Sequence, residues 1–200
     1  MTDQAIFLHV CCGPCAEYPV KVLREEGYRI QGYFYNPNIQ PAEEYERREE
    51  GVKLFSELHA VPMLYEGMSE EAIWRSFPSS LRSKHCEACY GMRMEQVAKR
   101  CKEEGYPAFT TSLTVSLWQD HEAIIRAGQR AAEHHGVEFK YFDFRSGYRE
   151  GQNMAREDGL YRQKYCGCIY SLRETKFTDK ICEELGIDPA SLPERIDDLA

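Results

Sequence analysis

The chain has 200 residues, of which 29% are charged and 42% hydrophobic, and its net charge at neutral pH is −8. This length suits a single domain over residues 1–200, with a substantial core and an acidic tail over about residues 187–200. The negative charge argues against a protein that coats nucleic acid through overall attraction. Because no run reaches the roughly 20 apolar residues that span a bilayer, and the N-terminus lacks a signal-peptide pattern, we expect a cytoplasmic protein with no membrane partner.

Strands and helices are predicted to alternate along the chain. Apolar runs predict strands at about residues 5–10, 29–35, 61–65, 107–112 and 137–142. Helical periodicity predicts helices at about residues 15–26, 41–58, 69–77, 87–104, 119–135, 151–158 and 174–185. This alternation indicates an α/β fold, with a layered, mostly parallel sheet and helices on both faces.

Polar and thiol side chains follow several of the predicted strands. Cys11 and Cys12 come directly after the first strand, Asn36 after the second, and residues 110–112 end the fourth. Ligands of parallel sheets bind at the carboxyl ends of the strands. We therefore expect a pocket at this edge of the sheet, beside the thiols.

Seven of the nine cysteines fall into three tight groups, namely Cys11, Cys12 and Cys15, then Cys86 and Cys89, then Cys166 and Cys168. In a reducing compartment, grouped thiols more often bind metal or carry out redox chemistry than form structural disulfides. The two remaining residues, Cys101 and Cys182, share helical faces with apolar side chains, and we predict that both belong to the core.

The first two cysteine groups allow several interpretations. Cys12-Gly-Pro-Cys15 alone has the spacing of a thiol–disulfide oxidoreductase, but the other groups argue against a plain thioredoxin. Cys86 and Cys89 are predicted in the first turn of a helix that begins near Glu87, which is half of a zinc or iron–sulfur site. Cys11 and Cys12 would supply the other half. Four thiolates suit zinc and a 4Fe-4S cluster equally in number, and the adjacent pair favours the cluster.

The third group and Cys15 also leave alternatives open. Only one residue separates Cys166 from Cys168, so a bond between their sulfur atoms would close a small, strained and easily reduced ring. This spacing favours a two-electron switch, and two further metal ligands are the alternative. Cys15, at a helix start, either packs in the core or serves as a further metal ligand.

The segment before the third cysteine group mixes cations with aromatic residues. Such a mixture suits phosphate neutralisation and stacking on unpaired bases, and a solvated helix pair with packed tyrosines is the alternative. The candidate RNA-binding side chains here are Arg145, Arg149, Tyr161, Arg162, Lys164 and Tyr165. Trp74 and Trp118 are predicted to pack rather than to stack on a ligand.

Taken together, these motifs resemble the cobalamin-independent epoxyqueuosine reductases, the QueH family. The matching stretches span residues 8–15 (LHVCCGPC), 35–39 (YNPNI), 86–93 (CEACYGMR), 110–113 (TTSL), 143–145 (DFR) and 159–168 (GLYRQKYCGC). The resemblance extends from about residue 5 to residue 177. It implies a sheet similar to the nucleotide α-hydrolase type, also called HUP or PP-loop-like.

The resemblance also implies the reaction. It is the reductive removal of the epoxide oxygen from epoxyqueuosine at the wobble position of tRNA, in the anticodon loop, as the last step to queuosine. A 4Fe-4S cluster on Cys11, Cys12, Cys86 and Cys89 and a redox-active pair at Cys166 and Cys168 are implied as well, with room for an additional iron near Cys15.

The reaction needs two electrons, two protons and a group that polarises the epoxide oxygen. A cluster passes single electrons and a dithiol holds two, so both are consistent with the reaction, together with an external electron donor. Asp143 and Tyr165 are the candidate acids on the chain, and Asn36 is a candidate for substrate binding. PP-loop tRNA thiolases, the alternative class, need a Gly-rich loop after the first strand, where this chain has cysteines.

Overall fold

Five parallel strands form one sheet in the order β3-β2-β1-β4-β5. The protein is represented by a computed structural model that describes residues 4–70, 72 and 82–193. The strands are β1 (Gln4–His9), β2 (Tyr28–Phe34), β3 (Met63–Tyr65), β4 (Ala108–Thr111) and β5 (Glu138–Phe139). The predicted fold class and all five predicted strands are confirmed.

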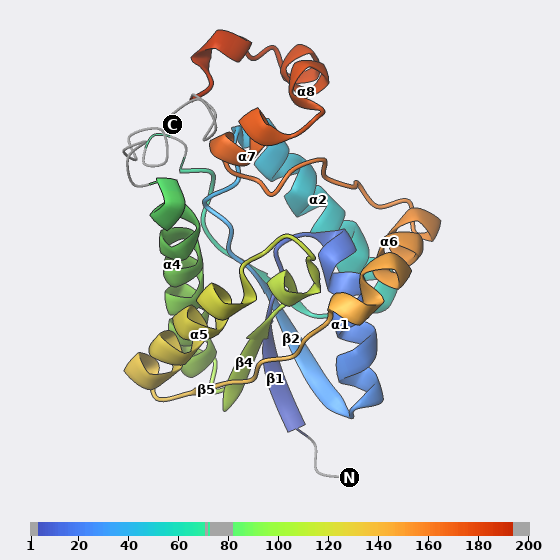
Figure 1. The fold of residues 1–200 in the computed structure, drawn as a ribbon. Helices are drawn as coiled ribbons and strands as arrows, with labels where there is room; N and C mark the ends of the chain where they lie inside the picture. Colours follow the sequence, from blue (N-terminus) through green and yellow to red (C-terminus); the bar gives the residue numbers. More distant parts are fainter. Residues whose placement is uncertain (1–3, 71, 73–81, 194–200) are drawn as a thin grey trace.

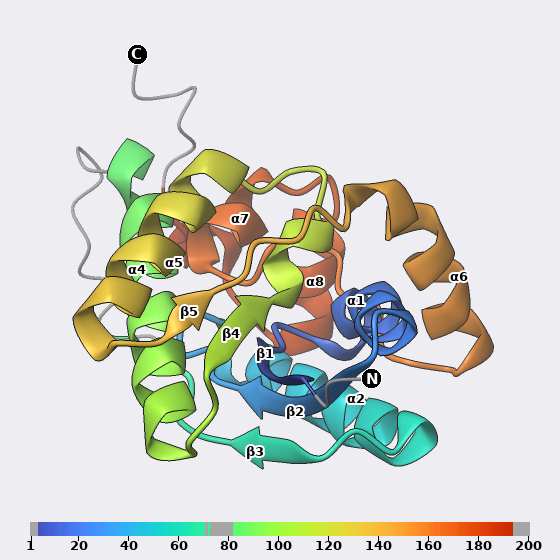
Figure 2. The same ribbon diagram turned by 90° about the horizontal axis from the view of Figure 1, so that it is seen from below.

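Helices cover both faces of the sheet (Figures 1 and 2). On one face lie α1 (Gly13–Glu25), α2 (Ala42–His59) and α6 (Tyr148–Glu157), and on the other lie α4 (Arg82–Glu103) and α5 (His121–His135). Two short helices, α7 (Ile169–Glu174) and α8 (Thr178–Leu185), lie beyond the carboxyl ends of the strands (Figure 1). Three 3₁₀ turns complete the described structure: η2 (Ser112–Val115), η3 (Arg145–Gly147) and η4 (Pro189–Ser191). In the part of the chain that the structure describes, no helix is long and apolar enough to cross a bilayer.

The central strand β1 is apolar on both sides because helices cover both faces of the sheet. Ile6 and Leu8 point into the core beneath α1 and α2, whereas Phe7, between them, packs with the side chains of α4 and α5. All three side chains are completely buried. Cys101 and Cys182 are also buried, with 0% and 2% of their surface exposed, so their predicted place in the core is confirmed.

The chain leaves the sheet in opposite directions after β1 and β4, which are neighbours. The segment after β1 leads into α1 on one face, and the segment after β4 leads through η2 to α5 on the other. Such a divergence opens a crevice at the carboxyl edge, where ligands of open α/β sheets bind. Because Cys11 follows β1 and Ser112 follows β4, the topology places a thiol and a hydroxyl across this crevice.

Three details differ from the sequence-based predictions. Strand β5 is limited to two residues, because it pairs only with the short strand β4. The predicted helix over 174–185 is wrong at its start: α7 ends at Glu174 and α8 begins at Thr178. The Thr178 hydroxyl lies within hydrogen-bond distance of the Leu172 and Thr175 carbonyls, and its one proton is shared between them. The predicted helix over 69–77 lies largely outside the described residues.

The start of α1 packs closely against α2, and this contact gives a test of the fold. A methyl group on Gly13 would lie 2.8 Å from the carbonyl oxygen of Gly51, whereas one on Gly91, in α4, would meet nothing within 4 Å. We expect Gly13→Ala to lower the free energy of unfolding by about 1–3 kcal/mol, because the backbones must separate. Gly91→Ala should raise it by about 0.5–1 kcal/mol through helix propensity. Urea unfolding of both variants measures the difference, and equal effects would contradict the described packing.

Candidate active site

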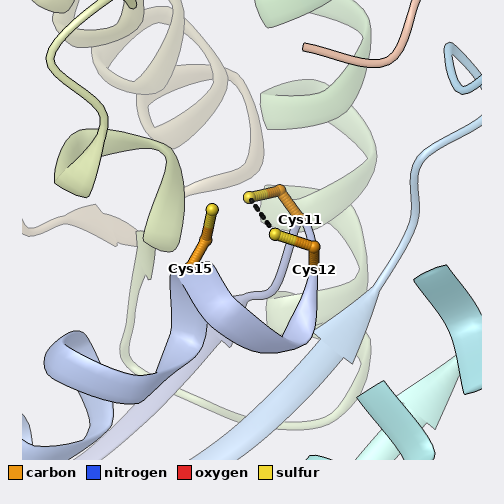
Figure 3. Close-up of side chains that lie close together, drawn as sticks. All are labelled: Cys11, Cys12 and Cys15. Carbon is orange, nitrogen blue, oxygen red and sulfur yellow. Dashed lines mark hydrogen bonds between the residues drawn. The ribbon is translucent and has the colours of Figure 1, made fainter. Parts of the chain in front are cut away.

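Three thiols meet at the start of α1 (Figure 3). The sulfur atoms of Cys11, Cys12 and Cys15 all lie within 4.8 Å of one another, and those of Cys11 and Cys12 are 3.9 Å apart. Ser112 holds Cys11 in place, since its hydroxyl accepts from the Cys11 backbone N–H at 3.0 Å and donates to the Cys11 sulfur at 3.3 Å. The loops after β1 and β4 are therefore joined at the crevice, and Cys15 both packs in the core and lies beside the other two thiols.

The three thiols differ in acidity because they compete for the same protons. Hydrogen bonds from Cys12 and Cys15 lower the pKa of Cys11, and Ser112 contributes in the same direction. Burial raises the pKa of Cys12. Gln163 adds N–H donors, at 2.9 Å from the Cys12 sulfur and 3.4 Å from the Cys15 sulfur. Such donors stabilise thiolates and tune thiolate-bound metals.

The second cysteine pair lies further along its helix than predicted. Because α4 begins at Arg82 and not near Glu87, Cys86 and Cys89 occupy its second turn. The Cys86 residue is exposed, whereas Cys89 is buried, and burial raises the pKa of the Cys89 thiol to about 11. Neither thiol belongs to the group formed by the first three, and the predicted four-cysteine ligand set stays a prediction.

A buried guanidinium connects the three cysteine groups. Arg93, one turn after Cys89 on α4, is 2% exposed and interacts electrostatically with the thiols of Cys89, Cys166 and Cys11. Although burial opposes its charge, these thiols raise the pKa of Arg93. The same cation and burial together lower the pKa of His9 to about 4, so this imidazole is neutral at physiological pH. Arg93 thus places one buried positive charge near cysteine residues from all three groups.

The third cysteine group is held by Arg48 of α2. Its guanidinium donates to the carbonyl oxygens of Cys166 at 2.8 Å and Tyr165 at 3.0 Å, and to the Glu44 carboxylate at 2.8 Å. Arg48 is 3% exposed, and Glu44 keeps it charged by raising its pKa against the effect of burial. Between the two cysteines, Gly167 has a φ of 142°. A methyl group there would lie 3.1 Å from the Arg48 Nη1, so this position requires glycine.

The two thiols of this group differ in accessibility. Cys166 is exposed, and Gln119 donates to its sulfur at 3.2 Å. Cys168 is buried at the start of α7, and burial raises its pKa to about 12. A solution reagent or substrate therefore meets Cys166 first, while Cys168 keeps its proton.

A cavity of about 840 Å³ brings the first and third cysteine groups together, since Cys11, Cys15 and Cys166 all line it. Of the predicted substrate-binding residues, Asn36, Arg162 and Lys164 line the cavity, and Tyr165 does so as well. Asn36 is fully buried and donates to the Val10 carbonyl, whereas Arg162 is exposed.

Asp143, Arg145, Arg149 and Tyr161 lie outside this lining, and Tyr165 contributes little to it. Asp143 and Arg145 form an exposed ion pair, and this pairing lowers the Asp143 pKa to about 2, so the carboxylate carries no proton to donate at neutral pH. Arg149 is exposed at the start of α6 and is absent from the lining. Tyr161 donates its hydroxyl to Glu44 at 2.7 Å. Tyr165 is 8% exposed, and its hydroxyl donates to the Gln40 carbonyl, so little of its ring faces the cavity.

Several residues at the site were not assigned from the sequence. These residues, which interact with the cysteine groups, are Arg48, Arg93, Gln119 and Gln163. Arg93 and Gln163 lie in two of the stretches that match the family, residues 86–93 and 159–168, and this match could have marked them as site residues. The prediction that Trp118 packs in the interior is wrong, because 75% of its surface is exposed. Trp74 lies outside the described residues.

The Arg48 hydrogen bonds can be tested directly. Arg48→Met should lower the free energy of unfolding by about 3–5 kcal/mol, because it leaves the Glu44 carboxylate buried without its partner. Arg48→Lys keeps the positive charge but loses the planar set of guanidinium N–H donors, so we expect it to lose less stability than Arg48→Met. Urea unfolding measures both effects, and alkylation of Cys166 should become faster as its segment loosens. Equal stability of Arg48→Met and the parent protein would contradict this account.

Comparison with solved structures supports the fold. A crystal structure from Methanocaldococcus jannaschii, described as a predicted subunit of tRNA methyltransferase, superposes with a TM-score of 0.52 over 96% of this chain and 93% of that one. Their sequences are 13% identical, so the likeness concerns the fold alone.

Sequence relatives are much closer. The epoxyqueuosine reductase QueH of Dehalococcoides mccartyi is 33% identical over 83% of this chain and 91% of its own length. The protein of the same name from Thermotoga maritima is 34% identical over 86% of this chain and 92% of its own length. The family model described as "Epoxyqueuosine reductase QueH", a family of oxidoreductases, matches residues 6–174. This chain therefore belongs to the QueH family.

Proposed function

We propose that this protein reduces epoxyqueuosine at the wobble position of tRNA to queuosine. The observation that carries the proposal is the cavity of about 840 Å³ that Cys11, Cys15 and Cys166 all line. Its volume suits a modified nucleobase, and thiols from two groups line one space. The names of the family and of its relatives supply the substrate.

The donor set around α1 fits an iron–sulfur cluster. Three thiols lie within 4.8 Å of one another, Gln163 and Ser112 donate hydrogen bonds to sulfur atoms, and the buried Arg93 offsets thiolate charge. We assign a 4Fe-4S cluster to Cys11, Cys12, Cys86 and Cys89, with Cys15 as the candidate ligand of an additional iron. When bound, such a cluster supplies electrons one at a time from an external donor.

The chain itself supplies the remaining two-electron chemistry in this proposal. Cys166 and Cys168 give up two electrons and two protons as their sulfur atoms join. The two C–O bonds of the epoxide break, its oxygen leaves as water, and a carbon–carbon double bond forms. Gln119 orients the exposed Cys166 sulfur, and buried Cys168 keeps the second proton until it is needed. An external donor then reduces the disulfide, which its short ring makes easily reducible.

The cluster assignment predicts which substitutions remove metal. Changing Cys11, Cys12, Cys86 or Cys89 to Ala should remove most of the iron, the sulfide and the visible absorbance of thiolate-bound iron from anaerobically reconstituted protein. Cys182→Ala is the matched control, because this thiol is buried in a separate cluster with α7 and α8 side chains. Full iron and sulfide content in any of the four variants would contradict its ligand role.

The redox assignment predicts a different outcome for the third group. Cys166→Ser should keep the parent's iron and sulfide content yet abolish turnover, whereas Cys101→Ser, in the core between α4 and α5, should change neither. The assay combines reconstituted protein, epoxyqueuosine-containing tRNA and a strong reductant, with nucleosides analysed by mass. We expect the modified base to lose the mass of one oxygen. Loss of iron from Cys166→Ser would place this residue in the metal site, and a gain of sulfur or a requirement for ATP would indicate a thiolase.

A further inference from the structure

Trp118 is the most exposed large hydrophobic side chain in the described part of the protein, at 75%. It lies between η2 and α5 and lines the cavity that contains Cys11, Cys15 and Cys166. An indole so exposed contributes little to the core, and its position at a cavity points to a ligand.

Neighbouring groups hold the indole in place. The Trp118 backbone N–H donates to the Ser116 hydroxyl at 3.2 Å. Its ring meets the ring of Tyr148 edge to face, with centroids 5.2 Å apart and an interplanar angle of 84°. Tyr148 in turn interacts electrostatically with Cys15 and Arg162. The ring is therefore positioned beside the thiols before any ligand arrives, which lowers the entropy cost of binding.

Cations line the same cavity as Trp118. Arg162 is exposed and lines the cavity, as do Lys176 and the half-exposed Phe177, whose ring centroid is 5.1 Å from the Lys176 nitrogen. An exposed aromatic face beside such cations suits single-stranded RNA, because bases stack on the ring while cations meet the phosphates. Although the whole chain has a net charge of −8, it presents cations and an exposed aromatic ring together at this cavity.

The tyrosines predicted to stack on a base are engaged elsewhere. Tyr161 does not line the cavity and donates to Glu44, and the Tyr165 ring is covered by the Arg48 guanidinium at 5.2 Å from its centroid. Trp118 offers the accessible ring that these residues do not.

We infer that Trp118 is the stacking platform for an unpaired base next to the modified base in the anticodon loop. The modified base enters the cavity toward the thiols, and its neighbour stacks on the indole at the mouth. This inference rests on the proposed function for the identity of the RNA, and it assigns a substrate-positioning role to a residue that carries no redox chemistry.

The test is RNA binding, which is independent of turnover. In a Trp74→Phe background, Trp118 is the sole tryptophan of the chain. Titration of reconstituted protein with a synthetic anticodon stem–loop should quench its fluorescence. Trp118→Ala should raise the Kd by roughly 5- to 150-fold, and Trp118→Phe by less, because loss of one base stack has that magnitude. In the turnover assay, Trp118→Ala should raise KM with little change in kcat.

Leu117→Ala is the matched control, because Leu117 is also exposed, at 54%, but does not line the cavity. It should leave the Kd unchanged. Absence of RNA binding by the parent protein, or an unchanged Kd for Trp118→Ala, would overturn the inference. If Trp118→Ala and Leu117→Ala bind RNA as tightly as the parent protein but are reduced more slowly by a protein electron donor, this surface would instead be a docking site for that donor. Quenching and weaker binding by Trp118→Ala would support the platform even if epoxyqueuosine were not reduced.

Discussion

The buried guanidinium of Arg48 fixes the relation between the sheet and the third cysteine group. The segment from Leu160 to Cys168 has no regular structure of its own, so side-chain packing at Leu160, Tyr165 and Cys168 and specific hydrogen bonds must hold it in place. Two of the guanidinium bonds go to backbone carbonyls of this segment and one to Glu44. A buried cation needs all of these partners, because an uncompensated charge in the interior is strongly unfavourable. The cost of burying it therefore enforces a single position for Cys166.

A second buried cation has a complementary role. Arg93 approaches the thiols from α4, on the face of the sheet opposite to Arg48 and α2. Both guanidinium groups interact electrostatically with cysteine sulfur atoms at the carboxyl edge, Arg48 with Cys12 and Arg93 with Cys11. Thiolates in a poorly hydrated site are stabilised by such charges. An acidic protein thereby places two buried guanidinium groups, one of them paired with Glu44, near the sulfur atoms at this edge.

Periodicity was sufficient to predict the layered fold, because Phe7 and its neighbours on β1 are apolar on both faces, as in any central parallel strand. The position of Cys11 at a strand end likewise indicated where the site would lie. The partners of the tyrosine hydroxyls could not be predicted, since Tyr165 reaches Gln40 across 125 residues. The exposure of Trp118 could not be predicted for a related reason: tryptophan is usually packed, and only the three-dimensional arrangement shows that this residue is 75% exposed, with Tyr148 against the edge of its ring.

The sequence separation of the Arg48 contacts has a consequence for how the protein matures. Glu44 lies four residues away on α2, so this pair forms as soon as the helix does, whereas the carbonyl of Cys166 lies 118 residues further along. During synthesis, the Arg48 guanidinium therefore has its carboxylate partner but lacks its carbonyl partners until the segment with the third cysteine group has been made. Contacts of such long range form late in folding. The thiol environment is complete only once the chain through Cys168 has been made and has folded, and products truncated before that residue lack it.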